Sequence, residues 1–265
     1  MFLLSLHMAD DALLLGHRNS EWTGHGPNLE QDIAISNIAL DQIGQARNFY
    51  QYAALQFNEN RNAYAPLLQS PAFRQVSGSI DEDNLAYLRN ANEFKNHLLV
   101  ELNRGDWAFT IVRQFFISAY QQLLYTDLQK GTNKQLAAIA EKSLKELSYH
   151  VRWSGEWVIR LGDGTEESNR RIINAVDQLW PYTGELFLPA DFQQMAAEQG
   201  ILTDPASYRQ NWLEKIQEAF AQAGLPIPSN NWWQKGGKQG IHTEHLGYLL
   251  AEMQYLQRSY PGSVW

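Results

Sequence analysis

Long segments with helical periodicity constrain the fold of this chain most. Apolar residues recur every three to four positions, and alternating runs of β-branched residues are missing. A capping residue precedes each of the three longest segments: Asn28 before residues 29–57, Asp106 before a segment to about 130, and Asn133 before one to about 161. Residues 6–22 form a shorter fourth segment. The turns between the four suit antiparallel neighbours, so we predict an all-α four-helix bundle with additional C-terminal helices.

The rest of the chain is divided by glycine and proline. Residues 162–165 end one helix and begin a shorter one, and Asp204-Pro205 is a strong start for the next. Residues 226–240 are irregular, and a final helix is expected from 243 to about 260. Because no repeat or long linker separates these parts, we predict a single domain over residues 1–265.

Composition excludes several classes of protein. The chain has no cysteine, which excludes disulfides, thiolate metal sites and thiol catalysis. Its net charge of −8 argues against nucleic acid as the main partner. No apolar run approaches the roughly 18 residues of a membrane-spanning helix. The apolar start, residues 1–6, lacks a basic leader and is interrupted by His7, Asp10 and Asp11, so we expect a cytoplasmic protein without a signal peptide.

The run from Lys145 to His150 is similar to half of a di-iron site. In carboxylate-bridged di-iron bundles, one helix supplies Glu-x-x-His, with both ligands facing the interior. Three residues before His150 stands Leu147, which cannot bind a metal, and Glu146 lies about 100° away from it around the helix. A lone helical histidine is also common as a hydrogen-bonded core or surface residue. The segment therefore belongs either to a working oxygen-activating enzyme or to a relative that has lost its metal.

Other polar residues in the long segments have two interpretations. A polar stripe on one helix face marks either the solvent side, which is commoner, or a buried network. This stripe consists of Asn37, Asp41, Gln45 and Asn48. Arg113 stands among apolar residues and needs a carboxylate partner if it is buried, for which Glu21 and Asp41 are the candidates.

Two features near the C-terminus have weaker functional interpretations. Residues 242–245, His-Thr-Glu-His, place two histidines on one helix face, as in some metal sites. Helix capping by Thr243 or His242, with Glu244 complementing the helix dipole, explains the same residues. The preceding loop, residues 235–240, is similar to a phosphate loop but lacks the Walker pattern and follows no strand. Nucleotide or CoA binding through Lys235 and Lys238 is a further alternative.

Five segments together carry a family resemblance. They are Glu21-Trp22 and residues 38–48, 145–150, 236–247 and 250–258. Combined, they resemble the C subunit of the bacterial phenylacetyl-CoA epoxidase, the multicomponent oxygenase of aerobic phenylacetate breakdown. The similarity runs over nearly the whole chain.

This resemblance implies a ferritin-like bundle with a structural, non-catalytic role. The partner would be the homologous A subunit, which carries the di-iron centre and binds the CoA thioester. The complex inserts one oxygen atom from O₂ into the aromatic ring to form an epoxide, and a reductase subunit delivers electrons from NADPH. Association of this chain with a second copy is a further expectation.

The resemblance also implies which positions match the di-iron ligands of the A subunit. Two of the six positions, Glu21 and His150, keep a residue that can bind iron. The other four are altered: Gln42, Gln45, Arg113 and Leu147. We therefore expect no catalytic residue, metal or other cofactor in this chain, and di-iron in its partner. An autonomous di-iron oxygenase with atypical ligands is the alternative.

We further hypothesise that Glu21 and Arg113 form an ion pair in the space of the lost metal. Gln42, Gln45 and His150 would then complete a hydrogen-bond network. For partner binding, the exposed aromatic candidates are Trp232, Trp233 and Trp265.

Overall fold

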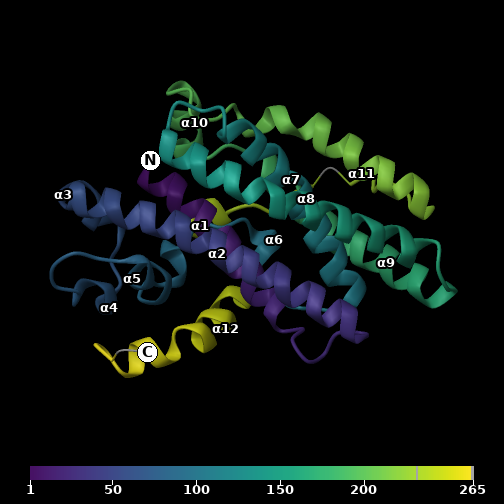
Figure 1. Ribbon diagram of the computed structural model, residues 1–265, viewed down its shortest axis with the longest axis horizontal. Coiled ribbons are helices and arrows are strands. Elements are labelled where there is room, and N and C mark those ends of the chain that lie inside the picture. The colour runs from purple at the N-terminus through teal and green to yellow at the C-terminus, as the bar shows by residue number, and fades with distance from the viewer. Residues whose placement is uncertain (231, 264–265) are drawn as a thin grey trace.

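Four long helices form the core of the protein. The computed structural model covers residues 1–265 and describes residues 1–230 and 232–263. The long helices are α1 (Phe2–Ser20), α2 (Leu29–Glu59), α7 (Trp107–Leu128) and α8 (Lys134–Gly162). Helix α1 packs along α2, α7 packs along α8, and α2 also contacts α8 (Figure 1). The described residues contain helices and turns and no strand, which confirms the predicted all-α bundle.

The predicted capping residues begin three of these helices. Each side chain accepts a hydrogen bond from the backbone N–H three residues later: Asn28 at 3.1 Å, Asp106 at 2.9 Å and Asn133 at 3.0 Å. Such a bond satisfies one of the free N–H groups of the first turn and is worth about 1 kcal/mol. The local sequence therefore determines where α2, α7 and α8 begin.

Helix α1 is buried on almost every side. It lies so close to α2 that a Cβ atom on Gly16 would come within 2.9 Å of Ile43 Cγ1. A helix in this position is expected to be apolar all round. It nevertheless carries several buried polar side chains, and these need partners from other elements. Besides Ser5, whose hydroxyl donates to the Met1 carbonyl, they are His7, Asp10, Asp11, Arg18 and Asn19.

Additional helices cover the bundle. Helices α9 (Glu166–Leu179) and α11 (Arg209–Ala223) pack against α7 and α8 (Figure 1). Aromatic rings join α11 to α7, with Trp212 in contact with Phe116 at a centroid separation of 5.6 Å. The remaining helices are α3 (Arg61–Tyr64), α4 (Pro71–Arg74), α5 (Glu82–Tyr87), α6 (Leu98–Glu101), α10 (Asp191–Glu198), α12 (Glu244–Met253) and α13 (Tyr255–Ser259).

The structure corrects several helix bounds. Helix α1 begins at Phe2, four residues earlier than expected, because the apolar start is part of the core. The helix expected from Asp204-Pro205 opens with a 3₁₀ turn before α11. The final helix is divided at Gln254, whose buried side chain donates to the Ala86 and Arg89 carbonyls.

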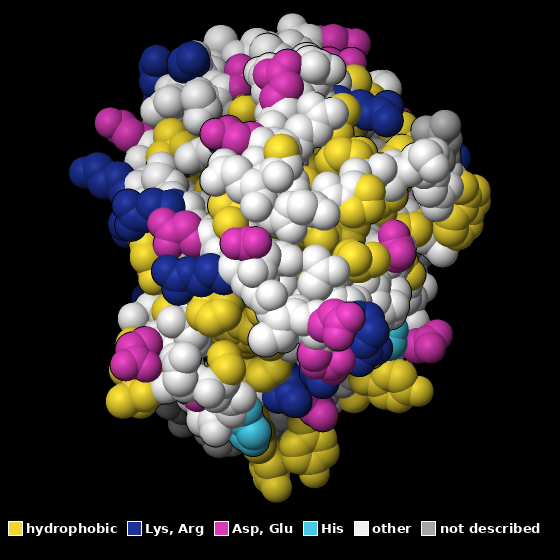
Figure 2. All heavy atoms as spheres, turned by 90° about the vertical axis from the view of Figure 1, so that its right-hand side faces the viewer, with side chains coloured by type: hydrophobic (Ala, Val, Ile, Leu, Met, Phe, Trp, Pro, Cys, Tyr) yellow, Lys and Arg dark blue, Asp and Glu magenta, His cyan; other side chains and the backbone are white. Residues whose placement is uncertain are grey.

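The surface carries charges of both signs. On the face shown in Figure 2, basic and acidic side chains alternate with hydrophobic ones, without one continuous basic area. No helix among the described residues is long and apolar enough to cross a membrane. Trp232 is exposed and Trp233 half-buried, whereas Trp265 lies outside the described residues.

Candidate functional site

Gln42 and His150 meet inside the bundle in a hydrogen-bond network. Gln42 Nε2 donates to Gln121 Oε1 at 3.3 Å and lies 3.4 Å from His150 Nδ1. The other ring nitrogen, His150 Nε2, lies 3.0 Å from Asp41 Oδ2. This pattern assigns the imidazole proton to Nε2, which donates to the Asp41 carboxylate. Gln42 and His150 are fully buried, so α2, α7 and α8 are joined through polar groups in their shared core.

Gln45 and Leu147 complete the bundle interior near this network. Gln45 Nε2 donates to Glu146 Oε2 at 2.9 Å, and Leu147 is fully buried. The polar stripe of α2 thus turns from solvent to the interior, with Asn37 exposed and Gln45 buried. Gln45 does not reach His150 through any hydrogen bond, so this part of the predicted network is wrong.

The predicted ion pair between Glu21 and Arg113 is also wrong. The Glu21 carboxylate accepts from Arg18 Nη1 at 2.6 Å, because Arg18 lies one turn earlier on the same chain segment. Arg113 is fully buried and donates instead to the carbonyls of Leu102 and Asn103, at 2.8 and 2.7 Å. Asp41, the other candidate partner, is bonded to His150.

Burial has a clear electrostatic effect on Arg113. Loss of water and, to a smaller extent, nearby Arg18 lower the pKa of its guanidinium to about 9, and Glu21 opposes both effects. Its Nε and Nη2 atoms have no hydrogen-bond partner among the described residues. Arg113 and Gln121 are eight residues apart on α7, about 12 Å along the helix axis. Of the six predicted positions, the described hydrogen bonds join only Gln42 to His150.

These residues do not fit a di-iron centre. Such a centre needs several buried carboxylates to balance and bridge the two ions. Here the interior offers two neutral amides, a leucine and a histidine whose ring nitrogens are both engaged, while Asp41 and Glu146 are only half-buried.

The C-terminal candidates have partners inside the chain. His242 Nδ1 lies 2.7 Å from Glu101 Oε2, and His242 Nε2 lies 3.1 Å from the Phe94 carbonyl. Both nitrogens are therefore used. Glu101 also accepts from the Thr243 N–H at 2.6 Å, just before α12, and the Thr243 side chain makes no capping hydrogen bond.

The glycine-rich loop folds around a carboxylate of its own chain. The N–H groups of Gly236 and Gly237 donate to Glu185 Oε1 at 2.8 and 2.9 Å. Lys238 is buried and donates to the Leu188 carbonyl and, at 3.1 Å, to Gln193 Oε1. The two N–H groups and Lys238 are thus occupied, whereas Lys235 is exposed. The engagement of the loop by Glu185 argues against this alternative.

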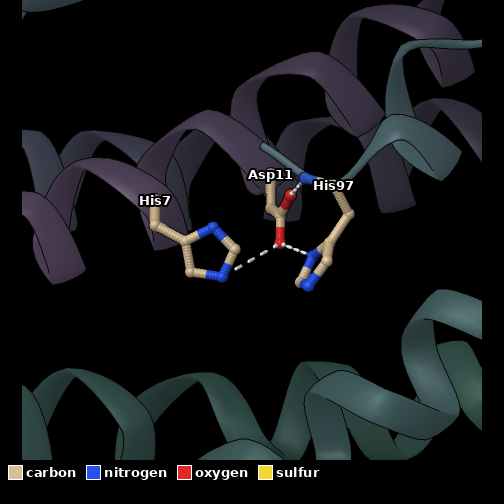
Figure 3. A group of neighbouring side chains, drawn as sticks. All are labelled: His7, Asp11 and His97. Carbon is tan, nitrogen blue, oxygen red and sulfur yellow. Dashed lines mark hydrogen bonds and ion pairs between the residues drawn. The ribbon is translucent and has the colours of Figure 1, made fainter. Parts of the chain in front are cut away.

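A second cluster of ligand-type residues lies outside the predicted positions. Among the residues that the structure describes, one group of three could hold a metal ion: His7 and Asp11 of α1, with His97 just before α6 (Figure 3). The Asp11 carboxylate stands between the two imidazoles. Its Oδ2 lies 2.7 Å from His97 Nδ1 and 3.9 Å from His7 Nε2, and its Oδ1 accepts from the His97 N–H at 2.7 Å.

Burial controls the charges of this cluster. It lowers the pKa of His7 to about 3 and holds the pKa of His97 well below its usual value, so both rings are neutral at pH 7. It raises the pKa of Asp11 to about 6. The sequence contained one signal for this site, namely a histidine and an aspartate at i and i+4 on an apolar helix. His97 is 86 residues away from Asp11, and no local pattern connects it to them.

Comparison with known proteins identifies the family of the chain. The family described as phenylacetic acid catabolic protein matches residues 2–265. The chain belongs to this family. A relative from Escherichia coli (strain K12), described as the C subunit of 1,2-phenylacetyl-CoA epoxidase, is 42% identical over 261 residues, covering 98% of this chain and 97% of the relative. The family resemblance of the sequence is thereby confirmed.

Proposed function

We propose that this chain is a structural, non-catalytic subunit of a multicomponent di-iron oxygenase that epoxidises phenylacetyl-CoA. Its role is to bind and stabilise the homologous catalytic A subunit, which holds the iron. The relative described as the C subunit of such an epoxidase supports this assignment. The observation that carries it is the interior of the bundle, where Gln42, Gln45, Arg113 and Leu147 offer no set of carboxylates for two iron ions.

An apolar stripe on α2 supports binding of a helical partner. Leu29, Ile33 and Leu40 lie at i, i+4 and i+11 and therefore share one helix face. They are 72, 52 and 67% exposed. Nothing lies within 4 Å of a Cβ placed on Gly44, one turn further, so a partner helix can approach closely there. An aliphatic face with a small residue suits packing against another helical bundle, which is the fold expected of the A subunit.

Co-expression with the A subunit tests this proposal. The tagged chain should copurify with the A subunit, and the pair, supplied with the reductase and NADPH, should convert phenylacetyl-CoA to its epoxide. All iron should remain with the A subunit when the two are separated. Failure to copurify, or stoichiometric iron in this chain, would refute the proposal and favour the autonomous oxygenase.

A surface variant tests the binding face. Leu40→Asp should reduce copurification at least about tenfold, because the charge must be desolvated at the interface. Its unfolding free energy should change by no more than about 0.5 kcal/mol, since Leu40 is exposed. Met195→Asp on α10, which is also exposed, is the matched control and should copurify normally. Equal loss in both variants, or in neither, would exclude α2 as the binding face.

A further inference from the structure

We propose that His7, Asp11 and His97 form a binding site for one divalent transition-metal ion, with zinc as the best match. This site is separate from the positions of the di-iron centre and independent of the proposed partnership. It would hold a structural ion near the centre of the molecule, joining α1 to the segment before α6.

The strongest observation is an unfavourable contact that a cation would relieve. His7 Nδ1 lies 2.6 Å from the Lys95 carbonyl and must carry the proton, because a carbonyl only accepts. The lone pair of His7 Nε2 then faces Asp11 Oδ2 across 3.9 Å, and this nitrogen has no hydrogen-bond partner. Two acceptors thus face each other between buried side chains, where an unpaired polar group is costly.

A comparison with the neighbouring acid shows that Asp11 lacks a cation. Asp10 is also fully buried, but its carboxylate accepts from the Arg89 guanidinium, the Tyr50 hydroxyl and the Lys95 N–H. Asp11 faces two imidazoles that burial keeps neutral. Of two adjacent buried carboxylates, one is therefore paired with a positive charge in direct contact, and the other is not.

Shifts of about 0.6 Å between ligand atoms would bring the three side chains to the spacing of a tetrahedral ion. Zinc–nitrogen and zinc–oxygen bonds of about 2.0–2.1 Å place neighbouring ligand atoms about 3.3 Å apart. The observed separations from Asp11 Oδ2, 3.9 Å to His7 Nε2 and 2.7 Å to His97 Nδ1, lie on either side of this value. Binding would displace the proton that His97 Nδ1 shares with Asp11, and His97 would then carry its proton on Nε2.

Zinc fits this donor set better than other ions. Two imidazoles and one carboxylate are typical ligands for zinc and for ferrous iron, whereas calcium and magnesium prefer oxygen alone. The ferrous sites with this donor set keep open positions for water or oxygen. Here His7, Asp11 and His97 are at most 4% exposed. Zinc needs one donor besides these three, whereas a six-coordinate ferrous ion needs three, so the buried site favours zinc.

Lys238 is the group that opposes a cation at this site. Its positive charge lowers the pKa values of Asp11 and of both histidines. The same ammonium also interacts with the buried Glu185 carboxylate. Asp11 and Glu185 together supply two negative charges against one positive charge, so the surroundings can accept a divalent ion more readily than Lys238 alone suggests.

Metal content of the full chain tests the proposal. The chain is expressed in zinc-supplemented medium, passed through a chelator column, and analysed by mass spectrometry for zinc. We expect about one zinc ion per chain. His7→Gln and Asp11→Asn should each lower the zinc content at least about tenfold. His242→Gln and His150→Gln are matched controls and should retain it, because both histidines bond to other side chains.

A second measurement does not depend on how the variants fold. X-ray absorption at the zinc edge of the unmodified protein should show two imidazoles and one oxygen donor at about 2.0–2.1 Å. Zinc below about a tenth of an ion per chain would overturn the proposal. So would zinc that is retained in folded His7→Gln, or an absorption spectrum without imidazole, since each indicates an adventitious ion only.

Discussion

Two buried polar regions of this protein contrast in how their groups are satisfied. Around Gln42 and His150, amides and an imidazole are joined by hydrogen bonds, and the adjoining Leu147 is apolar. Around Asp11, a carboxylate stands between two imidazoles, and one ring nitrogen faces it without a proton. The first region also has two amide oxygens, Gln42 Oε1 and Gln45 Oε1, without a hydrogen-bond partner among the described residues, but it holds no fully buried carboxylate. The second region holds a buried carboxylate that has no positive charge in direct contact. The two regions therefore differ in buried charge, and this difference, together with position in the bundle, is the reason for placing a metal ion in the second.

A glutamate at position 147, where the di-iron pattern would have an acid, should change the stability of the protein more than the other substitutions below. Leu147→Glu places a carboxylate at a fully buried position beside neutral groups. It should lower the free energy of unfolding by about 3 kcal/mol or more, measured by urea denaturation, and should not produce iron binding. Leu147→Met keeps the volume and should cost less than about 1.5 kcal/mol. A stable Leu147→Glu protein that binds iron would contradict this prediction, because it would show that one substitution is enough to restore metal binding in the bundle.

The second region should make the metal-free protein sensitive to acid. Between pH 6 and about 4 the unfolded chain protonates both His7 and His97, whose pKa values are lowered in the folded state. Asp11 has the opposite effect on stability. Its pKa of about 6 in the folded state means that the folded protein binds a proton at Asp11 at a higher pH than the unfolded chain does. The net difference is at most one proton, so the contribution of this cluster to stability should fall by up to about 1.4 kcal/mol for each pH unit of acidification.

Urea unfolding at several pH values, after removal of metal, checks this slope. His97→Gln removes one titrating group and should make stability nearly independent of pH in the same range. A slope that His97→Gln leaves unchanged would mean that the acid sensitivity comes from other groups.

A smaller loss of stability is expected when Asp41, the half-buried partner of His150, is changed. Asp41→Asn removes a charged acceptor of His150, but a third of the Asp41 side chain is exposed, so the cost should be about 1 kcal/mol. Glu141→Gln, an exposed change on α8, should stay within about 0.5 kcal/mol. A cost above about 3 kcal/mol for Asp41→Asn would mean that the network depends on its carboxylate far more than this exposure implies.

Much of the fold was predictable because its signals are local. Asn28, Asp106 and Asn133 cap the long helices, and the periodicity between them sets the helix type. The division of the last helix was not predictable, because it depends on Gln254 reaching the carbonyls of Ala86 and Arg89, far away in sequence.

The site residues were predictable only in part for the same reason. Gln42 and His150 meet as expected, but Glu21 binds Arg18, which is closer along the chain than Arg113. Hydrogen-bond partners on other helices depend on the rotation and depth of each helix, and helical spacing alone does not specify these. The cluster at Asp11 was missed because His97 reaches it from a segment with no helical pattern of its own.

Anomalous diffraction from crystals of the chain grown with both iron and zinc tests the central claim most directly. Data collected at the two absorption edges would locate each ion. We predict a zinc peak between His7, Asp11 and His97, and no iron or zinc peak between Gln42, Gln45 and His150. An iron peak in the bundle at Gln42 and His150 would contradict the account.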